Sequence, residues 1–409
     1  MAAHGGEVPA RPPAPPRVPR GRSFHWLDPS RWPAVPIPNI SIDPTNGAVL
    51  GIIPTWLQHD PAGHVVRIIA PDIVHNSNFG IGGHARILDF PSADTAWSVV
   101  AGMMQRVESR FDAQYATGLL RARRWSSSAE LGYDRSGTAR FFGVGNDTPY
   151  SAQSVYTDQQ LWLTETLGWN ITRAWQIGYT LTVRKVRVSG GRLPGVASIT
   201  DRFPDVRGLG TTREVLHRVS VAYDTRDSVA VPTRGVDWVV YGGVASRNGT
   251  PDASLFSEAG VDGRLYWSPT RRLTVAAHVD LRYMPSLHAA PFWALSSVGG
   301  DSSVLGGQQT LRGFVDSRFY DRNALSVSLE LRQAVLALEA LGTRLVLQVA
   351  PFYDGGRVFC AGGTHAFEKL HNVFGVGFRG VAAPFIVGYV DVGYGSEGMA
   401  VYTGVGYPF

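Results

Sequence analysis

Eleven consecutive residues alternate between apolar and polar side chains: Leu273-Thr274-Val275-Ala276-Ala277-His278-Val279-Asp280-Leu281-Arg282-Tyr283. In an extended chain one face would be apolar, and the other would carry His278, Asp280 and Arg282. A period of two over this length predicts a β-strand and not a helix. The length also matches a tilted strand that crosses a membrane, about 9–11 residues.

The same alternation recurs in Trp175–Arg184, Leu325–Arg332 and Leu345–Asp354. An arginine that faces lipid near the middle of a membrane costs about 2–4 kcal/mol, so the polar faces must point into a lumen. A soluble β-sandwich alternates too, but its strands are usually only about 5–6 residues long. The pattern therefore predicts an all-β fold, a transmembrane antiparallel β-barrel.

Candidate strands lie near residues 48–58, 64–75, 80–89, 95–106, 109–119, 123–135, 154–169, 174–188, 214–226, 235–244, 254–268, 272–286, 324–337, 344–358, 371–381, 385–396 and 400–409. Bacterial barrels have an even number of strands. We therefore expect about 16 strands, with one of the segments within 95–135 either not a strand or merged with its neighbour, and the first strand near Gly51. After residue 154 short connections alternate with long ones, as the two rims of a barrel require.

The composition excludes several classes of protein. Hydrophobic residues make up 44% of the chain, and no run approaches the roughly 18–20 apolar residues of a membrane-spanning helix. The single cysteine, Cys360, excludes an intramolecular disulfide and a cysteine-rich metal site. The net charge of +5 comes without a dense run of Lys and Arg, which disfavours nucleic-acid binding.

The N-terminal segment differs from the rest of the chain. Residues 1–40 are rich in Pro and Arg, so we expect a disordered tail followed by one barrel domain over residues 41–409. The tail lacks the apolar stretch that a signal peptide needs. Because an exported protein requires such a signal, we expect the natural start of the chain to differ from Met1.

A long polar segment before residue 324 contains the glycine-rich stretch Gly306–Phe314, with Arg312 near its end. An arginine in such a loop is usually solvated. Here the parity of two later strands places Glu330 and Asp354 on faces that point into the lumen. Because a guanidinium can bind a carboxylate through two parallel hydrogen bonds, we expect Arg312 to hold the loop against the inside of the barrel.

The chain ends in the alternating stretch Val401–Phe409, whose last residue is aromatic. We expect the terminal phenylalanine to lie at a membrane interface, where the aromatic girdles of barrels lie. The spacing of Tyr402, Gly404, Tyr407 and Phe409 resembles the C-terminal signal of outer-membrane barrels. That resemblance implies that the barrel-assembly machinery reads these residues during insertion.

Three further motifs resemble those of one superfamily, and they occur in its order along the chain. Phe352–Gly356 is similar to its F-x-D-x-G strand motif, whose acid, here Asp354, receives the arginine of the loop. The other two are a strand-turn-strand motif and a loop motif of the form aliphatic-Arg-Gly-aromatic. Their residues are Asp224, Arg226, Asp227, Pro232, Arg234 and Gly235 in the first, and Leu311, Arg312, Gly313 and Phe314 in the second.

These motifs are those of the BamA/TamA-type surface-antigen barrels of the bacterial outer membrane. The resemblance covers roughly residues 45–409 and implies a sixteen-stranded barrel with a long sixth extracellular loop that folds inward. Assembly and secretion members of that superfamily carry periplasmic POTRA domains in front of the barrel. The residues before Ile40 are too few for such a domain, so we expect a barrel without POTRA domains.

The resemblance implies a role in the assembly or translocation of outer-membrane proteins or lipids through a lateral seam between the first and last strands. Gly404 and Pro408 would weaken the last strand and suit such a seam. A passive pore or a structural surface-antigen barrel is the main alternative. A lipid hydrolase that uses the lumenal His278 is a less favoured one.

We expect no catalytic residues, no metal and no cofactor. Gly375–Gly380 matches the pattern G-x-G-x-x-G, but another strand follows it instead of the helix that a dinucleotide site requires. The expected partners are outer-membrane lipids, namely lipopolysaccharide and phospholipid, and the barrel-assembly machinery. No nucleic acid is expected.

Overall fold

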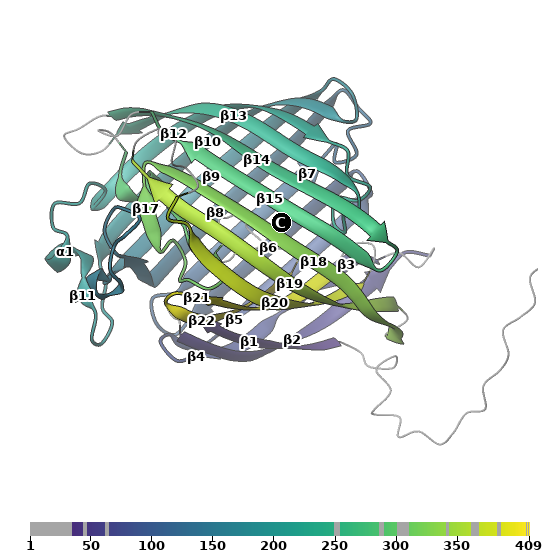
Figure 1. The fold of residues 1–409 in the computed structure, drawn as a ribbon, viewed down its shortest axis with the longest axis horizontal. Helices are drawn as coiled ribbons and strands as arrows, with labels where there is room; N and C mark the ends of the chain where they lie inside the picture. Colours follow the sequence, from purple (N-terminus) through teal and green to yellow (C-terminus); the bar gives the residue numbers. More distant parts are fainter. Residues whose placement is uncertain are drawn as a thin grey trace, which may run out of the picture.

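The computed structural model describes residues 35–43, 47–61, 65–248, 254–285, 290–300, 311–340, 343–360, 368–382, 386–405, 407 and 409. These residues are mostly β-strand and form one barrel (Figure 1). No helix among them is long and apolar enough to cross a membrane. Residues 1–34 of the predicted tail lie outside the described residues, and the first strand already begins at Val35.

The main sheet contains 20 strands. Their bounds are β1 Val35–Asp43, β2 Gly47–His59, β3 Val65–Ile69, β4 Asp72–Asn76, β5 Gly80–Ser92, β6 Thr95–Met104, β7 Ser109–Thr117, β8 Trp125–Phe141, β9 Ser154–Asn170, β10 Trp175–Gly190, β11 Ala197–Ser198, β12 Gly210–Asp224, β13 Gly235–Asn248, β14 Ser254–Thr270, β15 Leu273–Tyr283, β18 Asn323–Ala340, β19 Thr343–Phe359, β20 His371–Ala382, β21 Ile386–Gly395 and β22 Gly398–Val405. The loop between β15 and β18 holds a separate pair, β16 (Ser296–Val298) and β17 (Phe319–Asp321). The described helices are short: η3 Tyr150–Ala152, α1 Ile199–Arg202 and η4 Phe292–Ala294.

The main sheet closes on itself. β3 and β4 are two halves of one strand, because both pair with β2 and with β5. β11 has only two residues and runs parallel to β9. Setting β11 aside and counting β3 and β4 once, eighteen antiparallel strands surround the barrel in the described part of the chain, and the circuit closes between β1 and β22. The predicted antiparallel barrel is confirmed, with a strand number close to that expected.

Two details of the predicted strand order are wrong. The segments within 95–135 do not merge, since β6, β7 and β8 are three strands that pair in succession. The first strand is β1, whereas Gly51 lies in β2. Pro36 and Pro38 make β1 resemble the proline-rich tail, but proline is tolerated in a strand at a sheet edge because it lacks only one backbone donor.

Side chains along each strand alternate between two environments. On β10, Tyr179 and Val183 are exposed on the outer face, and Val186 and Val188 are buried inside. Exposed aromatic side chains gather near the short turns and form a girdle that contains Trp125, Trp169, Trp175, Trp238 and Trp267. Aromatic girdles of this kind mark a membrane interface.

The two rims of the barrel differ in the length of their connections. β9 and β10 are joined by residues 171–174, and β14 and β15 by residues 271–272. The opposite rim carries longer connections, including residues 191–209 and the loop between β15 and β18. Outer-membrane barrels have short periplasmic turns and longer extracellular loops, so the long-loop rim is the extracellular one.

Packed side chains from the loops fill the extracellular end of the lumen. Phe141, Ile199, Phe292 and Tyr320 form a buried hydrophobic cluster with Val186 of the wall. The ring centroids of Phe141 and Phe292 are 4.7 Å apart. α1 and β11 lie at this end of the barrel (Figure 1), so loops cover the extracellular mouth.

Candidate functional site

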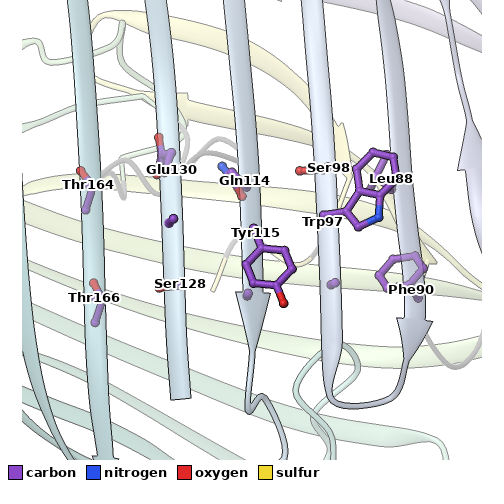
Figure 2. A pocket seen from close by; sticks show the side chains of 13 residues that line it. Leu88, Phe90, Trp97, Ser98, Gln114, Tyr115, Ser128, Glu130, Thr164 and Thr166 are labelled. Carbon is purple, nitrogen blue, oxygen red and sulfur yellow. The ribbon is translucent and has the colours of Figure 1, made fainter. Parts of the chain in front are cut away.

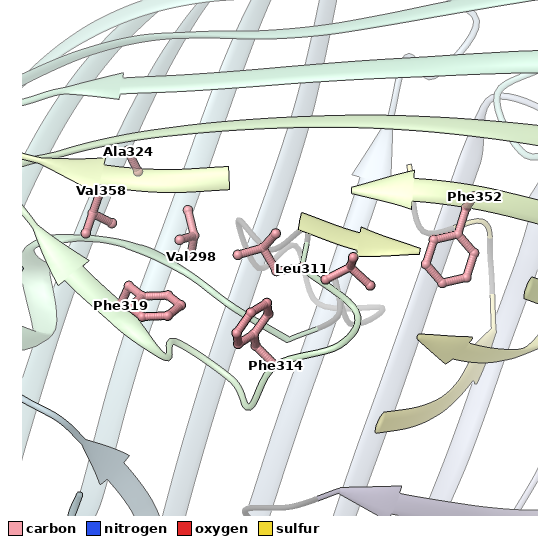
Figure 3. Packing of buried hydrophobic residues seen from close by; sticks show 8 residues of the cluster. Val298, Leu311, Phe314, Phe319, Ala324, Phe352 and Val358 are labelled. Atoms are coloured by element: carbon pink, nitrogen blue, oxygen red, sulfur yellow. The ribbon is translucent and has the colours of Figure 1, made fainter. Parts of the chain in front are cut away.

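The loop between β15 and β18 enters the barrel and packs on its inner wall. Leu311 exchanges backbone hydrogen bonds with Gly300, each at 3.2 Å. Residues 306–310 of the glycine-rich stretch lie outside the described residues. Figure 3 shows Leu311, Phe314 and Phe319 of the loop turned toward side chains of the wall. The full buried cluster is Val298, Leu311, Phe314, Phe319, Ala324, Phe352, Val358 and Val373.

Arg312 is only 2% exposed and contacts three carboxylates. Its Nε and Nη2 atoms donate to the two carboxylate oxygens of Asp354 at 2.9 and 2.8 Å. Nη1 donates to Glu330 at 3.0 Å and to Asp391 at 2.9 Å. The guanidinium carbon lies 3.6 Å from the ring centroid of Phe352. The structure thus brings Arg312 together with Glu330 and Asp354, the two predicted partners, and adds Asp391.

Asp391 on β21 and two further arginines complete a buried charge network. Arg379 donates through Nη2 to Glu330 at 3.1 Å and is also paired with Asp391. Arg332 donates through Nε to Glu330 at 3.0 Å. Three cations therefore face three anions, which compensates the cost of burying each charge. The members are Arg312, Arg332, Arg379, Glu330, Asp354 and Asp391.

The sequence contained a signal for the missed members of this network. Asp391 stands between Val390 and Val392, and Arg379 follows Phe378. Strand parity alone would place both charged side chains in the lumen. Burial would lower the pKa of Arg312, but Asp354, Asp391 and Glu330 raise it well above its ordinary value. The arginine is therefore charged at neutral pH.

A second arginine of the same loop, Arg318, holds the loop to both flanking regions of the barrel. Its guanidinium pairs with Glu397, in the turn between β21 and β22, at 2.7 Å. It also donates to the hydroxyl and the backbone carbonyl of Thr148 at 3.0 and 2.6 Å. Its carbon lies 4.2 Å from the ring centroid of Phe142. No sequence motif pointed to this contact.

The segment Phe141–Asn146, which follows β8, also contacts the loop. The backbone N–H of Gly145 donates to the carbonyl of Tyr320 at 2.7 Å. Asn146 accepts from the backbone N–H of Val358 at 3.0 Å. The loop is therefore fixed between β8 on one side and the strands that follow it on the other.

The backbone of the loop lies directly on β21 near Arg312. A Cβ atom added to Gly393 would be 2.2 Å from the carbonyl oxygen of Arg312. A contact this close admits only glycine, since the obstructing atom belongs to the backbone and cannot rotate away. The loop is thus seated by shape as well as by charge.

The strand-turn-strand motif forms a periplasmic turn between β12 and β13. Arg226 donates to both carboxylate oxygens of Asp224 at 3.0 and 2.8 Å, and it is 3.1 Å from Asp237. Burial would lower the pKa of Arg226, but these two carboxylates raise it above its ordinary value. Gly235 has a φ of +102°, and a Cβ there would lie 2.3 Å from the carbonyl oxygen of Thr225.

Asp227 ties the two ends of this turn together. It accepts hydrogen bonds from the backbone N–H of Thr233 at 2.8 Å, from the Thr233 hydroxyl at 2.5 Å and from the N–H of Arg234 at 3.1 Å. Pro232, beside them, limits the freedom of the turn. The motif therefore builds a rigid turn at the periplasmic rim and lies far along the chain from the Arg312 network.

We expect Asp227→Ala to lower the free energy of unfolding by about 0.5–1.5 kcal/mol, because the turn loses three acceptor contacts. Burial would raise the pKa of Asp227, but the hydrogen bonds from Thr233 and Arg234 hold the pKa below its ordinary value of 3.8. The carboxylate therefore stabilises the fold above pH 3.8, and this stabilisation is lost as the pH falls through the folded pKa. Thermal unfolding of both proteins at pH 7 and near pH 3 tests this, with the exposed Asp205→Ala as control. A difference in melting temperature between Asp227→Ala and the unmodified protein that is larger near pH 3 than at pH 7 would contradict this expectation.

The C-terminal residues do not lie at a membrane interface, and that prediction is wrong. β22 ends at Val405, and Phe409 is 8% exposed, stacked on His278 with ring centroids 5.3 Å apart. Arg332 donates to the carbonyl oxygen of Phe409 at 3.0 Å, and its guanidinium carbon lies 3.7 Å from the ring centroid of Tyr407. These contacts inside the lumen outweigh interfacial burial of the aromatic rings.

Tyr407 and Tyr402 contact other parts of the interior. Tyr407 donates to the side-chain oxygen of Gln348 at 3.0 Å. The hydroxyl of Tyr402 donates to the carbonyl of Phe314, so the last strand contacts the inward loop directly. The side chain at position 404 lies outside the described residues.

The lumen is not completely filled. A hollow of about 350 Å³ lies against β5 to β9. Figure 2 shows Ser98, Gln114, Glu130 and Thr164 at one level on neighbouring strands of this wall. The lining mixes apolar side chains, among them Leu88, Phe90 and Trp97, with hydroxyl, amide and carboxylate groups.

The fold and the site define a bacterial outer-membrane β-barrel. The antiparallel sheet closes around a charged lumen, its outer face is apolar with an aromatic girdle, and a buried arginine holds an inward loop. The sequence model of the Omp85 superfamily domain matches residues 97–395. The chain belongs to the Omp85 superfamily, which confirms the resemblance found in the sequence.

Three solved structures are similar to this chain to differing degrees. BamA from Haemophilus ducreyi, crystallised without POTRA domains 1–3, is similar with a TM-score of 0.50 and 12% identity, over 93% of this chain and 77% of that chain. CdiB from Escherichia coli has a TM-score of 0.48 and 14% identity, over 92% of this chain and 63% of its own. CdiB from Acinetobacter baumannii has a TM-score of 0.48 and 11% identity, over 88% and 65%. The chain thus spans less than two thirds of either CdiB. A search of curated proteins gives no match.

Proposed function

We propose that this barrel assists the assembly or translocation of outer-membrane proteins or lipids through the seam between β1 and β22. The pairing at this seam carries the proposal. Among the residues that the structure describes, the two strands share a single register pair, Ile42 with Val401, whereas β1 and β2 pair along the whole of Val35–Asp43. Within this part of the chain, separating β1 from β22 therefore breaks fewer backbone hydrogen bonds than separating any other neighbours around the barrel.

The end of the last strand supports the same proposal. The chain leaves the wall after Val405, so Tyr407 and Phe409 add no strand pairing to the seam. β22 is also held from inside, because Tyr402 contacts the inward loop and Arg318 pairs with the turn before β22. We infer that the loop sets the position of the last strand and thereby the width of the seam.

The partners in this proposal are the ones that such a seam would meet. Outer-membrane lipids, lipopolysaccharide and phospholipid, surround its outer face, and a client chain or lipid would pass between the two strands. The barrel-assembly machinery would read the C-terminal residues of this chain during its own insertion.

A disulfide across the seam tests the proposal. Residues in register on neighbouring antiparallel strands have Cα atoms about 4.5–5.5 Å apart, within the range of a disulfide. In a Cys360→Ser background, the pair Ile42→Cys and Val401→Cys should lock the seam on oxidation. We expect the oxidised barrel, reconstituted in liposomes, to lose the insertion of a denatured client barrel, and the reduced barrel to retain it.

A matched lock inside the wall serves as control. Ile177→Cys and Val221→Cys are register partners on β10 and β12, so their disulfide leaves the seam free. Equal activity of the oxidised and reduced seam variants would show that the seam does not open. Absence of insertion above empty liposomes for every variant would show that the assembly role itself is wrong.

A passive barrel is the second candidate, and the unfilled hollow beside β5 to β9 favours it. The packed loops at the extracellular mouth oppose it. Conductance across a planar bilayer separates the two: steady open currents through the unmodified protein would support a pore.

A further inference from the structure

Four basic side chains lie together on the outer face of the barrel, near its extracellular rim. They belong to β8, β10 and β12. β9 lies between β8 and β10, and β10 pairs directly with β12 (Figure 1). All four are exposed. This basic patch consists of Arg135, Lys185, Arg187 and Arg213.

Strand parity shows that the patch faces outward. Val186 and Val188, which alternate with Lys185 and Arg187, are buried inside the barrel. Thr212 and Glu214 flank Arg213 and are likewise buried, at 1% and 2% exposure. The basic side chains therefore project away from the lumen, on the same face as the lipid-facing residues of these strands.

The register brings the four cations close to one another. Lys185 is the direct cross-strand partner of Arg213. Gln159 on β9 is the partner of both Arg135 and Arg187, so it separates them by two strand spacings, about 10 Å. Like charges directly opposite each other destabilise a strand pair. Among the residues that the structure describes, no carboxylate forms an ion pair with any of the four. An anion supplied from outside would remove this repulsion.

The height of the patch on the wall identifies the source of that anion. Trp175, in the periplasmic aromatic girdle, is on the same face of β10 as Lys185, ten residues away. At about 3.3 Å per residue and a tilt of about 45°, ten residues rise roughly 23 Å, close to the apolar band of about 25 Å of an outer-membrane barrel. The patch thus begins where the apolar band ends, at the level of the headgroups of the outer leaflet.

We propose that the basic patch binds the phosphate groups of a phosphorylated lipid in the outer leaflet. Three of its four members are arginines, whose guanidinium fork matches a phosphate bidentately. The adjacent exposed Val183 and Leu161 would contact the acyl chains. This site rests on the outer-membrane location of the barrel and does not depend on the seam or on the assembly role.

Titration of the purified, detergent-solubilised barrel with a bis-phosphorylated lipid A tests the site through tryptophan fluorescence or native mass spectrometry. The patch variant combines Arg135→Gln, Lys185→Gln, Arg187→Gln and Arg213→Gln. The control variant removes the same charge from exposed periplasmic turns, with Arg123→Gln, Arg173→Gln, Arg271→Gln and Arg272→Gln. We expect the patch variant to bind at least about tenfold more weakly and the control variant to bind within about twofold of the unmodified barrel.

Two further binding measurements establish which part of the lipid the patch recognises. Lipid A without phosphate groups should bind the unmodified barrel as weakly as the patch variant binds the phosphorylated lipid, and inorganic phosphate should compete only at concentrations far above the lipid. Heat-dependent gel migration of each variant establishes that it is folded. Equal affinity of the patch and control variants for the phosphorylated lipid would overturn the proposal. Equal affinity of the unmodified barrel for lipid A with and without phosphate groups would overturn it as well. Restored binding in Arg187→Lys, compared with Arg187→Gln, would support it.

Discussion

Arg312→Ala is expected to destabilise the docked loop by about 3–5 kcal/mol, the cost typical of removing one partner from a buried ion pair. The substitution leaves Asp354 without its bidentate donor and removes one donor each from Glu330 and Asp391. The two remaining arginines pair with the other carboxylates, Arg379 with Glu330 and Asp391 and Arg332 with Glu330, so the three buried carboxylates face only two cations. Water in the lumen would reduce the effect without removing it.

Limited proteolysis and the temperature of the heat-dependent gel shift measure this loss. We expect cleavage within the loop between β15 and β18 and a lower transition temperature. The transition temperature of Arg312→Lys should lie between those of Arg312→Ala and the unmodified barrel, because lysine keeps the charge but not the planar fork. The exposed Arg271→Ala should behave like the unmodified barrel. If Arg312→Ala resists heat and protease as the unmodified protein does, the anchor role is wrong.

Gly393→Ala should release the same loop without touching any charge. The new Cβ would collide with the carbonyl oxygen of Arg312, and overpacking of this kind costs about 1–3 kcal/mol. Gly388→Ala on the same strand is a matched control, because a Cβ at Gly388 meets no atom within 4 Å. The two variants differ only in whether the added methyl group faces the loop.

The combination of both loop substitutions distinguishes a shared mechanism from two separate ones. Once Arg312→Ala has released the loop, Gly393→Ala should cost little more, so the two effects should add to less than their sum. The melting temperatures of the two single variants and the double variant give this result. Full additivity would mean that β21 is damaged locally and that the loop is not involved.

Much of the wall could be predicted from the sequence, because each strand carries its own signal. Leu273–Tyr283 alternates strictly, and the structure forms β15 over the same residues. β1 could not be predicted in this way. Its Pro36 and Pro38 carry no strand signal, and its place in the barrel depends on pairing with β2, a partner that lies after a turn.

The charge network was predictable only in part. Parity placed Glu330 and Asp354 in the lumen and made them candidate partners of Arg312. It could not choose among the other inward charges, because selecting Asp391 requires the curvature that brings β21 beside the loop. Arg318 had no strand parity to place it, since it lies in a loop whose path is set by packing against the wall.

The C-terminus shows where a local pattern gives the wrong answer. Val401–Phe409 alternates to the last residue, as a strand in the wall would. In the described part of the chain β22 has one register pair with β1 in the wall, whereas in the lumen the final aromatic residue contacts Arg332 and His278. The choice between these environments depends on the strength of the neighbouring strand pairing, which no stretch of sequence reports by itself.

The position of the half-buried Tyr407 and the buried Phe409 inside the lumen also has a consequence for the assembly of the barrel. We propose that the assembly machinery reads these residues only while the chain is unfolded, because Arg332, Gln348 and His278 contact them in the folded barrel. A folded barrel would then no longer compete with newly exported chains for that machinery, and insertion would proceed in one direction.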